Sequence, residues 1–102
     1  MSYNESKQNL TNFINYINNK KIKLDIDCQT NLKLLIKLWR YKNLSLEHLT
    51  IAKQYLHPYI SSFINNIENE IELKRLWNEY LSNVMEYRIN LNMDIVKNFK
   101  VK

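Results

Sequence analysis

The chain of 102 residues contains no glycine. Phosphate-cradling loops, dinucleotide-binding turns, nucleophile elbows and calcium loops all need a residue with positive φ or a close backbone approach. None of these sites can be built in its usual form without glycine, so the sequence excludes several classes of enzyme. Asparagine tolerates the left-handed conformation best among residues with a side chain, and we expect it at some of the turns.

Cysteine and long apolar runs are also scarce. The single cysteine, Cys28, cannot form an internal disulfide. No apolar run approaches the roughly 20 residues that a membrane-spanning helix needs, so we expect no membrane partner. Residues 1–5 lack the charged-then-apolar pattern of a secretion signal, and this predicts an intracellular protein.

The spacing of apolar residues predicts a single, mainly α-helical domain over residues 1–102. Apolar side chains recur every three to four positions in most of the chain. Pro58, the only proline, is expected to end one helix near His57 and to open the next. The first predicted helix spans residues 5–19. The second is capped by Thr30 or Asn31 and ends at Tyr41, and the third spans 46–56. A fourth begins at Pro58 and has a break near Asn69-Glu70, and a short fifth helix spans 94–100.

Two short stretches alternate between apolar and polar residues, which is typical of a strand. They are Lys21-Ile22-Lys23-Leu24-Asp25-Ile26-Asp27 and Tyr87-Arg88-Ile89-Asn90-Leu91-Asn92-Met93. A lone strand leaves its backbone groups unpaired. We therefore predict a minor two-stranded β element formed by these two segments, or pairing of the first segment with another chain.

An internal duplication is suggested by two similar segments that contain both tryptophans. These are Leu35-Ile36-Lys37-Leu38-Trp39 and Leu73-Lys74-Arg75-Leu76-Trp77. The pair Phe13-Ile14-Asn15-Tyr16-Ile17 and Phe63-Ile64-Asn65-Asn66-Ile67 matches in the same order.

The order of the matches predicts two similar helical units, residues 1–57 and 58–102, packed together with both tryptophans near the centre. A rival match pairs residues 22–27 with 89–94 and crosses the tryptophan match, so a simple duplication cannot contain both. The alternative to duplication is that amphipathic helices of similar composition resemble one another.

The length, the glycine-free sequence rich in Asn, Ile and Lys, and the paired Leu-x-x-Leu-Trp segments resemble small orphan proteins of Acidianus filamentous viruses. The resemblance covers the whole chain. It implies a protein of an archaeal virus that acts in the host cytoplasm, and it implies no catalytic residue.

Candidate catalytic and metal-binding residues are few. Cys28, His48 and His57 match no zinc-binding spacing. Ser45 and His48 lie three residues apart, but a helix cap explains that serine. We therefore predict a protein that is not an enzyme and has neither a metal site nor a cofactor.

Our leading hypothesis for the function is a module that binds a peptide or protein segment in the cleft between the two units. Tyrosine is abundant here and is enriched at protein interfaces, because it combines a large apolar area with a polar tip. The residues predicted to contribute to the cleft are Arg40, Tyr41, Tyr55 and Tyr80.

The alternative function is binding of nucleic acid by the basic region of residues 20–42. The chain carries a net charge of +5, and most of the excess lies in its first half. Lys33, Lys37 and Arg40 share one helix face, where they could follow a phosphate backbone. The competing interpretation is a solvated stripe on an otherwise buried helix.

Overall fold

The computed structural model describes residues 2–42 and 44–100, with the side chains of residues 3–42 and 44–93. This part of the chain is mainly helical, as predicted. The elements are α1 (Ser2–Lys20), α2 (Ile26–Leu38), α3 (Leu46–Ile51), the π-helical turn η1 (Ala52–Leu56), α4 (His57–Asn66) and α5 (Ile71–Lys100).

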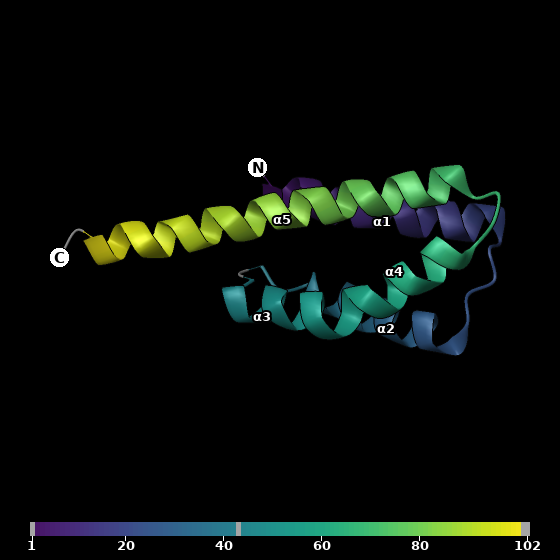
Figure 1. Cartoon of the computed structure of the whole chain (residues 1–102), viewed down its shortest axis with the longest axis horizontal. Helices are drawn as coiled ribbons and strands as arrows, with labels where there is room; N and C mark the ends of the chain where they lie inside the picture. Colours follow the sequence, from purple (N-terminus) through teal and green to yellow (C-terminus); the bar gives the residue numbers. More distant parts are fainter. Residues whose placement is uncertain (1, 43, 101–102) are drawn as a thin grey trace.

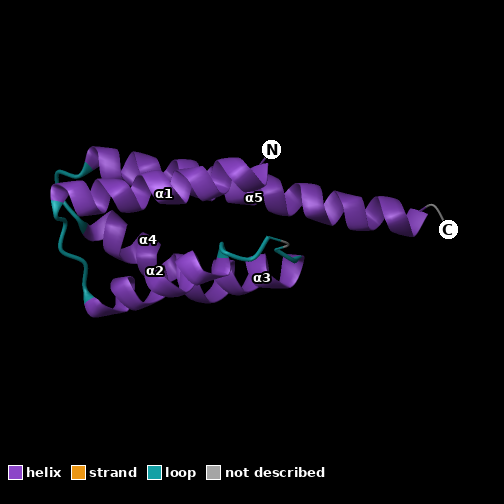
Figure 2. Cartoon of the chain, turned by 180° about the vertical axis from the view of Figure 1, so that it is seen from behind, coloured by secondary structure: helices purple, strands orange, loops and turns teal. Residues whose placement is uncertain are grey.

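The helices form two layers (Figure 1). One layer is the antiparallel pair of α1 and α5, and the other contains α2 and the continuous run α3–η1–α4. Seen from behind, the same two layers remain separate and are joined by loops at one end (Figure 2). The C-terminal part of α5 extends well beyond α1, which gives the molecule its elongated extents of 52 × 22 × 21 Å.

One cluster of buried side chains connects the two layers. On α1, Leu10, Phe13 and Ile17 are buried, at the three- to four-residue spacing of a helical face. The ring of Phe13 lies 5.0 Å from that of Trp77 on α5. The cluster also takes side chains from α2, α3, η1 and α4, so the helices share a single core.

The chain remains helical on both sides of Pro58. Proline lacks an N–H group, and its ring clashes with the carbonyl four residues earlier in a regular α-helix. The wider π-helical turn η1 lies immediately before α4, whose first turn contains Pro58. Pro58 lies in the first turn of α4, as expected, but the chain does not leave the helical conformation before it, and the expected end near His57 is replaced by this π-helical turn.

The predicted β element is not present in the part of the chain that the structure describes. Residues 22–25 form an irregular connection between α1 and α2, and residues 87–93 are helical. In the connection, Ile22 and Leu24 are half-buried against the core while their charged neighbours are exposed. In the helical segment the alternation arises from two stripes of i, i+4 pairs on different sides of α5.

The predicted duplication is not confirmed. Both tryptophans are buried near the centre, but Trp39 caps the end of α2 whereas Trp77 lies in the second turn of α5. The predicted unit boundary at Pro58 falls inside the continuous run α3–η1–α4.

The break predicted near Asn69 is confirmed. Asn69 has φ of 64° just before α5 begins, and it takes the left-handed conformation in place of a glycine. Lys21, at the end of α1, has φ of 54°. The short helix predicted over 94–100 is the end of α5 and not a separate element.

Helix α2 begins several residues earlier than predicted because Asp25 caps it. The Cys28 backbone N–H donates to Asp25 Oδ1 at 2.7 Å. We expect Asp25→Ala to lower the free energy of unfolding by about 1 kcal/mol, since this N–H loses its acceptor. Asp25→Asn keeps a capping oxygen and should lower the free energy of unfolding by only a few tenths of a kcal/mol. Urea unfolding of both variants measures the difference, and equal losses would contradict the capping role.

Candidate functional site

A surface groove runs between α5 and the α3–η1–α4 run. It consists of two adjoining hollows of about 300 and 250 Å³ that share Met85 and Arg88. The first hollow is lined by Leu49, Lys53, His57, Pro58, Ser61, Leu81, Val84, Met85 and Arg88. The second is lined by Leu46, Met85, Arg88, Ile89 and Asn92. We call these two hollows together the groove.

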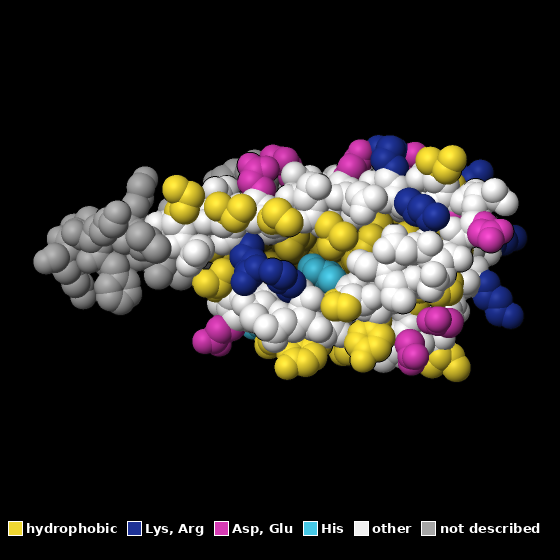
Figure 3. Space-filling view, viewed as in Figure 1, with side chains coloured by type: hydrophobic (Ala, Val, Ile, Leu, Met, Phe, Trp, Pro, Cys, Tyr) yellow, Lys and Arg dark blue, Asp and Glu magenta, His cyan; other side chains and the backbone are white. Residues whose placement is uncertain are grey.

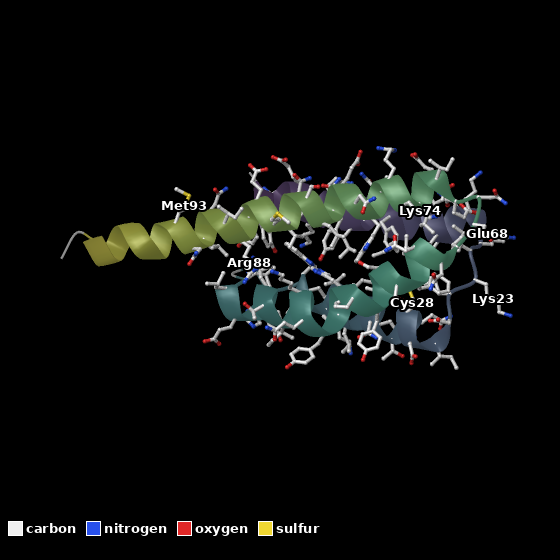
Figure 4. The ribbon with its side chains drawn as sticks, viewed as in Figure 1. Lys23, Cys28, Glu68, Lys74, Arg88 and Met93 are labelled. Atoms are coloured by element: carbon white, nitrogen blue, oxygen red, sulfur yellow. The ribbon has the colours of Figure 1, made fainter. Side chains whose placement is uncertain are left out.

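Apolar side chains dominate the groove and continue along α5. Met85, Ile89 and Met93 are 64%, 52% and 57% exposed and follow one another at i, i+4 spacing. Figure 3 shows hydrophobic side chains in a row along this part of α5, next to a hollow that contains a histidine. Met85 and Ile89 line the groove, and Met93 lies one turn further along α5 (Figure 4).

Two basic side chains, Lys53 and Arg88, line the groove from opposite elements. Trp77 Nε1 donates to Ser61 Oγ at 2.8 Å, and this bond helps to set the antiparallel register of α4 and α5. Lys53 lies one turn before His57. In this antiparallel register it faces the turn of α5 that ends at Arg88, and both side chains line the same hollow. Figure 4 shows Arg88 between α5 and the layer containing η1.

No acidic residue lines either hollow of the groove. Arg75 forms ion pairs with Glu72 and Glu79 on another part of α5, whereas neither Lys53 nor Arg88 forms one with a described acidic side chain. The lining of the groove is therefore mostly apolar and carries two positive charges with no acidic residue beside them.

A buried hydrogen-bonded network of Trp39, Tyr80 and His57 supports the groove from below. The Tyr80 hydroxyl lies 2.8 Å from Trp39 Nε1 and 2.8 Å from His57 Nε2. The indole N–H can only donate, so Trp39 donates to the Tyr80 oxygen. The Tyr80 O–H then donates to Nε2 of a neutral His57, an arrangement that gives every one of these groups a partner.

Aromatic rings enclose His57. Its ring centroid lies 5.3 Å from that of Tyr80 and 5.7 Å from that of Trp77, edge-on in both cases. Burial lowers the pKa of His57 to about 4, because the imidazolium would lose its hydration in this setting. Burial also raises the pKa of Tyr80. Both groups are therefore neutral near pH 7, and the network forms a rigid floor.

The residues predicted to form a peptide cleft are not brought together. Tyr80 is fully buried, does not line the groove and supports it through His57, so its contact with a bound peptide stays a prediction. Tyr41 and Tyr55 are exposed, as is Arg40, but none of the three lines the groove. Tyr41 stacks on His48 at a centroid distance of 5.4 Å.

The sequence interpretation missed Lys53, His57, Met85 and Arg88. A signal for Met85 was present in the sequence, because Met85, Ile89 and Met93 recur at helical spacing. That signal was hidden by the strand assignment of residues 87–93.

The basic residues of the alternative function lie on α2 and just after it. Lys33 and Lys37 are exposed one turn apart on α2, and Arg40 is exposed in the turn that follows the helix. This face is separate from the groove, which none of the three lines.

The residues considered as metal ligands are separated in the fold. Burial, and to a smaller extent Asp25, raises the pKa of Cys28 to about 11, so it remains a thiol. His48 forms a capping box with Ser45 at the start of α3. Among the described residues, no group of three or more His, Cys, Asp or Glu gathers to hold a metal ion.

Comparison of the chain with protein-family models, with curated proteins and with solved structures finds no match. Within the residues that the structure describes, no helix combines the length and apolar character needed to cross a membrane.

Proposed function

We propose that the chain is a non-enzymatic interaction module that binds a helical segment of another protein in the groove. The observation that carries this proposal is an apolar groove between helices, with strongly exposed Met85 and Ile89 along one side. Exposed apolar surface of this kind, bordered by polar residues, is typical of protein-interaction sites. Methionine adapts its shape to a partner because its side chain is unbranched.

A helix suits this groove better than an extended peptide. The groove is built from helices and offers no sheet edge for strand addition, so a partner gains affinity mainly through its side chains. An amphipathic helix presents apolar residues at i, i+3, i+4 and i+7, and such a stripe can follow the length of α5. The floor of Tyr80 and His57 is already ordered, which lowers the entropy cost of binding.

The test is selection of binding peptides from a displayed library of random helical peptides about four turns long. We expect enrichment of amphipathic helices. Met85→Glu should weaken their binding by on the order of tenfold or more, because the partner's apolar face would have to desolvate a carboxylate. Binding is measured by titration calorimetry or fluorescence anisotropy.

Ile71→Glu is the matched control, since Ile71 is an 82% exposed apolar residue of α5 outside the groove. It should leave the affinity unchanged. Failure to enrich any peptide, or equal effects of the two substitutions, would contradict the proposed function.

The second candidate function remains nucleic-acid binding, favoured by the exposed side chains of Lys33 and Lys37 on α2 and of Arg40 in the turn after it. Contacts of this kind neutralise phosphates and release counterions. Affinity of such a binder falls steeply as the salt concentration rises, because it neutralises many phosphates, whereas binding that buries apolar surface in the groove depends much less on salt.

A further inference from the structure

We infer that the groove selects an acidic amphipathic helix, one that places a carboxylate between two apolar anchors. This inference rests on the proposed function and adds the chemistry of the partner. It is carried by the positions of Lys53 and Arg88 in a lining whose other residues are mostly apolar.

The first step is the charge of the lining. Lys53, on η1, and Arg88, on α5, line the same hollow, and no Asp or Glu lines either hollow. Arg88 is only partly exposed, so a partner that covers the groove takes its guanidinium further out of water. A covered cation is costly unless a carboxylate pairs with it. The partner must therefore supply the acidic group.

The second step is the position of the charge along the groove. Arg88 lines both hollows, so it lies where they join, with Met85 beside it. Leu49 and Leu81 line the hollow on one side of this junction, and Leu46 and Ile89 line the other. A helix in the groove thus meets apolar surface, then a cation, then apolar surface. The complementary pattern is an Asp or Glu one turn from an apolar residue on each side.

The same charge disfavours other occupants. The C-terminal segment of a second copy, residues 94–102, contains three lysines and one aspartate and would bring positive charge to Lys53 and Arg88. A nucleic acid would match the charge, but its phosphates would cover the apolar side chains of Met85 and Ile89 without contacting them favourably. An acidic helix satisfies both features of the groove.

The experiment repeats the peptide selection on the wild-type chain and on charge variants. The double variant Lys53→Glu and Arg88→Glu should replace the acidic preference of the selected peptides with a basic one. A peptide selected on the wild type should lose affinity on the order of tenfold for the double variant at low salt, and less at high salt. Lys53→Glu alone changes an exposed side chain, so we expect the chain to fold, and it should give a smaller loss in the same direction.

Lys7→Glu on α1 is the matched control, because it makes the same charge change at an exposed position outside the groove. It should leave the acidic preference intact. Two outcomes would overturn the inference and leave the proposed function standing. In the first, the selected amphipathic helices show no acidic preference. In the second, they show one, but both charge variants leave it unchanged. Absence of any groove-dependent peptide would overturn both. A dimer that Met85→Glu dissociates, observed by sedimentation, would overturn the inference by identifying a second copy as the occupant.

Discussion

Replacing Tyr80 with phenylalanine is expected to lower the free energy of unfolding by about 2–4 kcal/mol. The hydroxyl accepts from Trp39 Nε1 and donates to His57 Nε2, each at 2.8 Å. Its removal leaves two buried polar groups without a partner while the ring packing stays the same. Urea unfolding measures the loss, which is a large share of the stability expected for a chain of this size.

Tyr59→Phe is the control for the loss of a tyrosine hydroxyl, since Tyr59 is 55% exposed. It should change the free energy of unfolding by no more than about 0.5 kcal/mol. Similar losses for the two variants would show that the buried network contributes little, and the rigid floor of the groove would have to be abandoned.

Acidification is expected to destabilise the protein through His57. The folded-state pKa of about 4 lies below the usual value of about 6.5 for an unfolded histidine, so the unfolded state binds the proton more readily. The stabilising contribution is complete above about pH 6.5 and is lost as the pH falls toward 4. The difference in pKa corresponds to roughly 3 kcal/mol. Lys53 and Arg88 line the hollow beside His57 and offer the imidazolium no compensating charge.

The measurement is urea unfolding as a function of pH between about 7 and 4. His57→Gln removes the titrating group and offers an amide oxygen to the Tyr80 hydroxyl, so its stability should depend less on pH over this range. His48→Gln makes the same substitution at a helix cap away from the network and should retain the wild-type dependence. If wild type and His57→Gln lose stability in parallel, His57 is not the group responsible.

The sequence predicts the helical class well because apolar spacing reports directly on buried faces. Leu10, Phe13 and Ile17 on α1 form such a face, and the break at Asn69 follows from the shift in apolar phase. The apolar pattern is less reliable where a helix and a strand can produce the same sequence. The segment 87–93 alternates like a strand, yet it is helical because its apolar residues lie on two sides of α5.

The groove could not be predicted because it depends on the register between distant segments. Lys53 and Arg88 lie 35 positions apart and line the same hollow only because α4 and α5 pack antiparallel. Tyr80 was expected at a surface because tyrosine is common at interfaces. Its buried hydroxyl is satisfied by Trp39, at the end of α2, and by His57, on α4, and these distant partners cannot be inferred from neighbouring residues.

The most direct test of the central claim is an NMR titration of the ¹⁵N-labelled chain with a selected acidic helical peptide. Binding in the groove predicts shifted amide signals at Leu49, Lys53, Met85 and Arg88, with signals at Lys33 and Lys37 unchanged. Shifts that cluster on the α2 face and leave the groove residues unmoved would contradict the claim.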